Sequence, residues 1–93
     1  MIHAFGCVKT RELFVTGKSR HFPLGVCKAG LRKLDYLHAA KRMDDLARVP
    51  GNRFEALKGD YEGFYSVRVN DQYRIVFRFV ESDAYGVKMT DYH

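Results

Sequence analysis

The sequence has little proline, little cysteine and no tryptophan, and it contains no long apolar run. Only two of its 93 residues are proline and 46% are hydrophobic, which excludes an intrinsically disordered chain. No apolar stretch approaches the roughly 20 residues that a membrane-spanning helix needs. The first residues, MIHAFGCVKTRELF, have neither the basic head nor the apolar stretch of a signal peptide. We therefore expect a cytoplasmic location and no membrane partner.

Cys7 and Cys27 could form a disulfide only if the fold brought them together, and the cytoplasm expected here is a reducing compartment. We interpret Cys7 and Cys27 as small, half-buried hydrophobic residues and assign them no chemistry. The four histidines and two cysteines also lack the close spacing of zinc motifs. The sequence thus predicts neither a metal site nor a cofactor.

Aromatic residues and positive charge are what the chain does contain. A 14% aromatic content gives a small core large side chains to pack, and the length supports a single domain over residues 1–93. Residues 1–50 carry ten Lys and Arg against four Asp and Glu, whereas residues 51–93 carry six against seven. This basic excess suits RNA, DNA or an acidic protein segment as a partner, although many solvated helices carry such charge without one.

The first half of the chain shows mainly helical patterns. Residues 1–5 alternate and predict a short strand, and residues 10–17 predict a short helix with Thr10 as N-cap and Gly17 as its stop. From Leu24 onward, apolar residues at steps of three and four predict a second helix. The same spacing continues through residues 43–49, until Pro50 and Gly51 end the helical segment.

After Pro50 the period changes to two. Residues 64–69, 73–80 and 84–89 alternate and are joined by short turns, which predicts a three-stranded antiparallel meander. A strand, two helices and this meander make an α+β sandwich in which helices cover one face of the sheet and leave the other available. The core side of the middle strand is predicted to carry Tyr73, Ile75, Phe77 and Phe79.

Arg74 and Arg78 then project from the opposite, open face. Such arginines either solubilise a strand or bind an anion, and the pair alone does not decide between these roles. The segment NRFEALKGDYEG leads into the meander with Glu55 and Lys58, which a short strand and turn could aim at the same face, although an ordinary solvated turn also explains Lys58. The last strand is followed by Asp91, Tyr92 and His93.

The stretch PGNRFEALKGDYEGFYSVRVNDQYRIVFRF followed by DYH resembles the HigB-type toxins of the RelE superfamily. The likeness is close over about the last 44 residues and extends to the helical half only in layout. It implies a fold of helices and an antiparallel sheet, and a ribosome-dependent endoribonuclease that cuts mRNA in the A site of the 70S ribosome without metal or cofactor. It also implies inhibition by a helix-turn-helix, HigA-like antitoxin encoded nearby, with operator DNA reached only through that antitoxin.

Carried over by motif position, the resemblance implies an active site of basic and aromatic residues. Glu55 departs from the pattern of some relatives, which place a histidine there. The catalytic candidates are Glu55, Lys58, Arg74, Asp91, Tyr92 and His93, and the candidates for contact with RNA or the ribosome are Lys28, Arg32, Lys33, Arg53 and Arg78.

These residue types fit RNA cleavage without metal. The reaction must deprotonate a ribose 2′-OH, neutralise the phosphorane and protonate the departing 5′ oxygen. Arg74 and Lys58 suit the phosphate, Glu55 is the candidate base, and His93 can act as general acid or base. Tyr92 could orient the phosphate or stack on a base. The expected product is a 2′,3′-cyclic phosphate.

Two other functions remain open from the sequence. One is a non-catalytic toxin of the same fold that inhibits a partner such as DNA gyrase, although such relatives generally lack this Lys, Arg, Tyr and His set. The other is an RNA-binding module without chemistry, which predicts strong salt dependence and no product.

Overall fold

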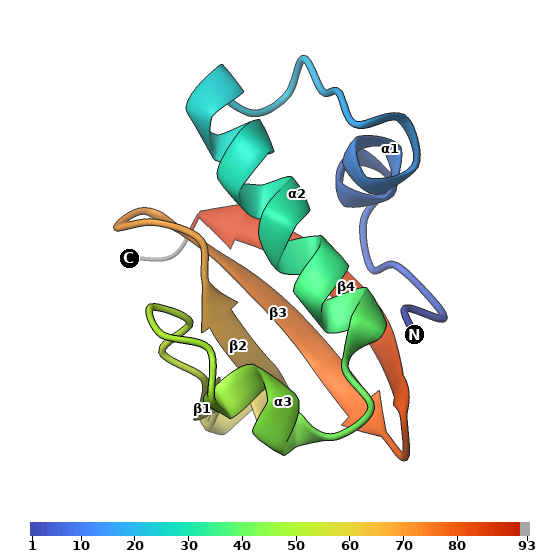
Figure 1. Cartoon of the computed structure of the whole chain (residues 1–93), viewed down its shortest axis with the longest axis vertical. Helices are drawn as coiled ribbons and strands as arrows, with labels where there is room; N and C mark the ends of the chain where they lie inside the picture. Colours follow the sequence, from blue (N-terminus) through green and yellow to red (C-terminus); the bar gives the residue numbers. More distant parts are fainter. Residues whose placement is uncertain (92–93) are drawn as a thin grey trace.

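A four-stranded antiparallel sheet is covered by helices on one face in the computed structural model, which describes residues 1–91 (Figure 1). The strands follow the order β1-β2-β3-β4. The expected α+β fold with its meander is therefore confirmed, with a short extra edge strand, β1. The helices are α1 (Val8–Thr16), α2 (Leu24–Ala39) and α3 (Met43–Ala47), with a 3-10 turn η1 (Gly59–Tyr61), and the strands are β1 (Glu55–Ala56), β2 (Tyr65–Arg68), β3 (Tyr73–Val80) and β4 (Asp83–Asp91).

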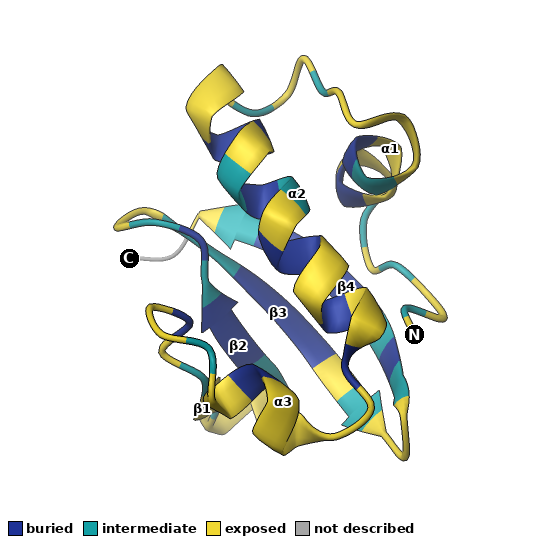
Figure 2. Ribbon diagram, viewed as in Figure 1, coloured by how far each residue is buried: buried dark blue, intermediate teal, exposed yellow. Residues whose placement is uncertain are grey.

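The core lies between α2 and the sheet, where the buried side of α2 faces β3 and β4 (Figure 2). Leu34, Leu37, Ile75 and Phe77 are fully buried, as their spacing predicts. Burial of each such side chain contributes about 1.5–3 kcal/mol before the entropy of ordering is subtracted. Leu24 departs from the pattern because it lies in the first turn of α2 and is 88% exposed.

Residues 1–5 do not form the predicted strand. They make two isolated parallel bridges to β4, Ile2 with Ala84 and Phe5 with Val87. Between the two bridged positions of β4, Gly86 has φ 62°, which interrupts the extended backbone that a continuous ladder requires. The N-terminal segment is therefore attached to the sheet without becoming a regular strand of it.

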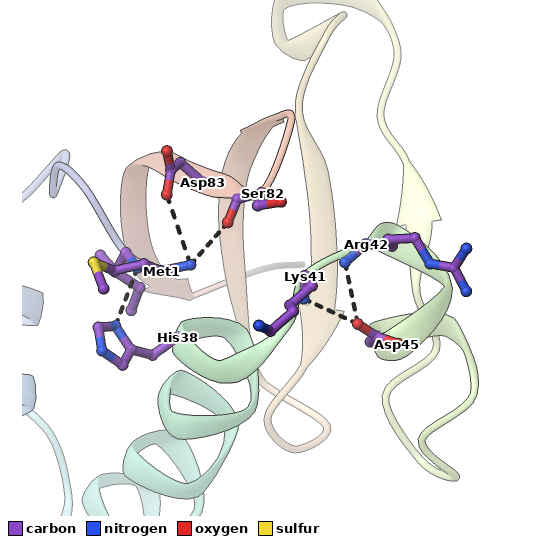
Figure 3. Close-up of polar contacts among 8 residues, drawn as sticks. Met1, His38, Lys41, Arg42, Asp45, Ser82 and Asp83 are labelled. Atoms are coloured by element: carbon purple, nitrogen blue, oxygen red, sulfur yellow. Dashed lines mark hydrogen bonds and ion pairs between the residues drawn. The ribbon is translucent and has the colours of Figure 1, made fainter.

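Polar contacts fix the start of this segment (Figure 3). The Met1 ammonium donates to the Ser82 carbonyl at 2.8 Å and lies 3.9 Å from a carboxylate oxygen of Asp83. The backbone N–H of Ile2 donates to Nδ1 of His38 at 3.1 Å. The beginning of the chain thereby meets both the β3–β4 turn and the end of α2.

Helix α1 begins at Val8, so the prediction that Thr10 caps it is wrong. Thr10 is fully buried within the helix, and its hydroxyl oxygen accepts the backbone N–H of Met89 at 2.9 Å. The predicted stop at Gly17 is confirmed, since this residue has φ 77° and its N–H closes the helix on the Leu13 carbonyl.

The helical segment expected to run to Val49 breaks between Ala39 and Met43, which gives three helices rather than two. One carboxylate oxygen of Asp45 accepts the backbone N–H groups of Lys41 and Arg42, at 2.9 and 3.1 Å (Figure 3). These two hydrogen bonds lower the pKa of Asp45 and satisfy N–H groups that precede the new helix. A local cap therefore overrides the continuous apolar spacing.

Both cysteines are free thiols. Cys27 is buried in α2, and its Sγ lies 3.5 Å from the Phe22 carbonyl oxygen. Cys7 is half-buried directly before α1, where burial raises the pKa of its thiol but hydrogen bonds from the start of the helix outweigh that effect and lower it. None of the helices described in residues 1–91 is long and apolar enough to cross a membrane.

Candidate active site on the open sheet face

The sheet face opposite the helices gathers charged and polar side chains from all four strands. In β3, Arg74 and Val76 alternate with the core residues, and paired positions of neighbouring strands share a face. Residues placed on the open face by this register are Glu55, Ser66, Arg68, Arg74, Val76, Arg78, Lys88 and Thr90.

Arg74 is fixed on this face by contacts with three residues from two segments, β2 and residues 53–55. Its Nε donates to Oγ of Ser66 at 2.9 Å, and one terminal nitrogen donates to the carbonyl oxygen of Arg53 at 2.7 Å. The same nitrogen lies 3.6 Å from a carboxylate oxygen of Glu55, and the Arg74 side chain is only 11% exposed. The guanidinium plane therefore has a defined orientation before any ligand binds.

Two arginines stand next to each other here, because Arg68 pairs with Arg74 across β2 and β3. Like charges at directly opposite positions repel. Asp71 forms an ion pair with Arg68, and Glu55 forms one with Arg74. Each carboxylate offsets part of the repulsion, and the two guanidinium groups together favour an anionic ligand.

Lys58 lies near the start of β2, whereas Arg68 and its partner Arg74 lie at the other end of that strand. It follows β1 and precedes η1, and its neighbour Leu57 donates a backbone hydrogen bond to Phe64 at 2.9 Å. Phe64 is four positions before Arg68 in the chain, which corresponds to about 13 Å along a strand. Within residues 1–91, the exposed Lys58 ammonium makes no hydrogen bond or ion pair.

The end of β4 is only partly described. Asp91 pairs with Tyr73 and so belongs to the helix-covered face, and its carboxylate accepts a hydrogen bond from Gln72 at 3.1 Å. Thr90, rather than Asp91, lies opposite Arg74. The candidates Tyr92 and His93 lie outside the described residues.

Comparison with known proteins identifies the family. The model of the RelE-like HigB toxins of type II toxin–antitoxin systems matches residues 9–93. The chain belongs to this HigB-like toxin family. Toxin HigB-1 of Vibrio cholerae serotype O1 is 44% identical over 78 residues, which are 82% of each chain. A protein named Endoribonuclease HigB, from Proteus vulgaris, is 44% identical over 41 residues, which are 44% of this chain and 45% of that one.

Solved structures support the same fold. The toxin–antitoxin complex YoeB-YefM from Staphylococcus aureus contains a chain with a TM-score of 0.64 and 17% identity, and the match covers 100% of this chain and 98% of that one. The YoeB/ParE toxin from Agrobacterium tumefaciens gives a TM-score of 0.52 at 17% identity, with 96% of both chains covered. These structures show the fold, whereas the family model and the Vibrio cholerae relative confirm the resemblance to HigB-type toxins seen in the sequence.

Four of the five candidates for RNA contact in this HigB-like chain are exposed. Lys28 and Arg32 lie on the outer side of α2, Arg53 precedes β1, and Arg78 lies in β3. Lys33 is different, because only 6% of it is exposed. An ammonium group buried in this way cannot contact an RNA phosphate, so its assignment to the RNA-binding surface is corrected.

A sequence signal for the burial of Lys33 exists. Val26, Gly30, Lys33 and Leu37 follow one another at steps of four, three and four, and all four are buried on one side of α2. Its ammonium group donates to Oδ1 of Asn52 and lies 5.7 Å from the centre of the Tyr36 ring. Burial lowers the pKa of Lys33, and the nearby charges of two arginines lower it further.

Several residues around Arg74 were not singled out in the sequence. Ser66 and Thr90 are small polar residues within strands, and their position is visible only once the strands are paired. The Arg53 contact uses a backbone carbonyl, which no side-chain pattern reveals. Pairing the two predicted strands of the hairpin would have placed Ser66 and Arg68 on the same face as Arg74, because alternate positions of a strand share one face.

Proposed function

We propose that this HigB-like protein is an endoribonuclease toxin that cuts mRNA in the A site of the bacterial ribosome and thereby inhibits translation. The observation that carries the proposal is the guanidinium of Arg74, which Ser66 and the carbonyl of Arg53 orient on the sheet face opposite the helices, beside the carboxylate of Glu55. The relative from Proteus vulgaris named as an endoribonuclease supports the same activity. We place the toxin in the cytoplasm, where its ribosomal substrate is found.

The reaction proceeds by internal attack of the RNA. The ribose 2′ oxygen forms a bond to the adjacent phosphorus, the bond from phosphorus to the 5′ oxygen breaks, and a 2′,3′-cyclic phosphate and a 5′-hydroxyl result. Glu55 takes the proton from the 2′-OH and His93 gives one to the departing oxygen. Each such proton transfer contributes about 10²–10⁴ in rate. No step in this scheme uses a metal ion.

Arg74 binds the non-bridging phosphate oxygens and stabilises the negative charge that grows on them in the transition state. Because its position is set before RNA arrives, little reorganisation accompanies the reaction. Lys58 adds a positive charge on a flexible side chain near the start of β2, and Tyr92 orients the phosphate or stacks on a base. Glu55 exchanges its ion pair with Arg74 for contact with the 2′-OH when the phosphate binds.

A need for the ribosome follows from the small number of proton-transfer groups in the proposed site. The candidate set has one imidazole, that of His93, and a general acid or base contributes only about 10²–10⁴ in rate, so in our proposal the RNA is held in a reactive geometry by a partner. Correct positioning contributes up to about 7–11 kcal/mol to a reaction of this kind. In our proposal the ribosomal A site supplies it, and the exposed basic residues of α2 contact ribosomal RNA.

The test compares the wild-type protein with Arg74→Ala and Glu55→Gln on message bound to programmed 70S ribosomes, with the RNA ends mapped. Removal of Arg74 should lower the cleavage rate at least about 100-fold, as loss of a transition-state contact does. Arg11→Ala is the matched control, since Arg11 is an exposed arginine of α1 distant in sequence from the site. Chelator is added only after ribosome assembly, and ribosome integrity is checked.

Three results would contradict parts of the proposal. Cleavage of free RNA at the same rate as ribosome-bound message would contradict the ribosome requirement. Loss of activity after chelator is added, with the ribosomes still intact, would contradict the metal-independent scheme. Tight ribosome binding with intact message would indicate a non-catalytic inhibitor of the same fold.

An antitoxin partner is part of the proposal. The Staphylococcus aureus relatives in fold were solved as YoeB-YefM complexes, and a family of toxin–antitoxin systems predicts a cognate inhibitor here. We propose a helix-turn-helix, HigA-like protein, through which the complex reaches operator DNA. Co-expression with the product of a neighbouring gene of this type should abolish toxicity and yield a co-purifying complex, whereas unchanged toxicity would exclude that product as the partner.

A further inference from the structure

Asn52 is a buried residue that connects α2, α3 and the sheet. It is 1% exposed, and its Oδ1 accepts a hydrogen bond from the ammonium group of Lys33. Its Nδ2 donates to the carbonyl of Leu46 at 3.0 Å, and its own backbone carbonyl accepts the N–H of Arg68 at 2.6 Å. The position of Asn52 is thus determined by three parts of the molecule, and Lys33 supplies the contact from α2.

The residue after Asn52 provides the contact to the candidate site. Arg53 has φ 44°, a left-handed conformation that is unfavourable for a residue other than glycine. Its carbonyl oxygen accepts the hydrogen bond from Arg74 at 2.7 Å. A strained conformation persists only where its surroundings hold it, and the fixed neighbour here is Asn52.

We propose that Lys33 is a positioning residue of the active site: through Asn52 it holds the turn at Arg53, whose carbonyl orients the guanidinium of Arg74. This inference rests on the proposed function in so far as it concerns cleavage. The positioning itself is a property of the free protein and can be measured without RNA.

Stability alone does not account for a lysine at this place. Its neighbours on the same side of α2 are apolar, and burial of an ammonium group disfavours its charged form, as the lowered pKa of Lys33 shows. Arg32 and Arg68 add repulsion, which the face of the Tyr36 ring offsets only in part. An apolar side chain would pack here without these penalties, but it would leave the Asn52 oxygen without the donor that it has in this structure.

The first experiment observes Arg74 directly. In nitrogen-15 NMR spectra of the uniformly labelled free protein, the Arg74 Nε–H signal is identified by its absence in Arg74→Lys. In Lys33→Met this signal should shift and its hydrogen exchange should accelerate at least about tenfold, because the hydrogen bond to Ser66 is formed for a smaller fraction of the time. The control is Lys9→Met, which makes the same change at an exposed lysine of α1 and should leave the signal unmoved.

The second experiment measures cleavage on programmed ribosomes. Lys33→Met should lower kcat about 10- to 100-fold, the effect expected for a misplacement of about 1 Å, while KM stays within about threefold. In an Arg74→Lys background the same change should have almost no further effect on kcat, because Lys33 acts through Arg74. Lys33→Gln, which keeps an N–H donor for Asn52, should recover much of the rate and also serves if Lys33→Met folds poorly.

The two experiments separate this inference from the proposed function. If wild-type protein fails to cleave ribosome-bound message, the proposed function is wrong and the NMR comparison alone judges the positioning. An unmoved Arg74 signal in folded Lys33→Met overturns the inference. An equal loss of kcat in the wild-type and Arg74→Lys backgrounds also overturns it, since Lys33 would then affect cleavage by a route that does not include Arg74.

Discussion

Replacing Thr10 by valine tests how α1 is attached to the sheet. The Thr10 hydroxyl oxygen accepts the backbone N–H of Met89 at 2.9 Å, and both residues are buried. Valine keeps the shape of threonine but has no acceptor, so the N–H group stays buried without its partner. This costs about 1–3 kcal/mol, the desolvation penalty of a buried polar group. A domain of this size has a free energy of unfolding of about 5–14 kcal/mol, so the loss is substantial.

Urea denaturation followed by circular dichroism measures this loss. Thr10→Val should lower the midpoint with an unchanged m-value and lower Tm by at least about 4 °C. Thr16→Val is the matched control in the same helix, because Thr16 is exposed and water can replace its contacts, so its effect should stay within about 0.5 kcal/mol. If the two variants lost equal stability, the buried hydrogen bond would not have the importance assigned to it.

Three further predictions concern stability. Asp45→Asn should be less stable than wild type at neutral pH. The difference should vanish as pH falls through the lowered pKa of Asp45, because a carboxyl group with a depressed pKa stabilises the fold only while it is ionised. Acid titrations of the two proteins test this. Wild type should gain stability relative to Lys33→Met as pH rises from the lowered pKa of Lys33 to about 10.4, because in this range the unfolded chain binds more protons than the folded protein. Urea melts at several pH values measure this difference in the free energy of unfolding, and a decrease with rising pH would contradict the prediction. Gly6→Ala should destabilise the protein by about 1–3 kcal/mol, because the added methyl group would lie 2.8 Å from the backbone oxygen of Gly86. An unchanged Tm would show that the N-terminal segment moves to accommodate the methyl group without loss of stability.

The parts of the fold that follow a repeated pattern could be predicted from the sequence. Ile75 and Phe77 alternate with Arg74 and Val76 over a long strand, and the apolar steps of α2 continue for four turns. Many residues contribute to each such pattern, so one residue that departs from it does not change the predicted helix or strand. The break before α3 depends instead on the one carboxylate of Asp45, and an apolar count cannot detect it.

The candidate site was only partly accessible from the sequence for a related reason. Arg74 and Glu55 could be proposed because charged side chains in or near strands are unusual and because the motif resembles a known family. Lys33 was misplaced because its charge suggested exposure, although its spacing with Leu37 assigns it to the buried side. The carbonyl of Arg53 could not be foreseen, since its direction depends on a left-handed backbone conformation at a residue that rarely adopts one.

The attachment of the first residues to β4 has a consequence for the newly synthesised chain. Ile2 and Phe5 bridge to β4, and Thr10 binds its backbone across 79 positions of sequence. During translation, α1 therefore has no partner strand until residues 83–91 have left the ribosome, and contacts so distant in sequence form slowly. Thr90, on that same strand, completes the face around Arg74. The face around Arg74, which we propose to be the active site, is therefore incomplete until the end of synthesis, and an antitoxin made at the same time has this interval in which to bind.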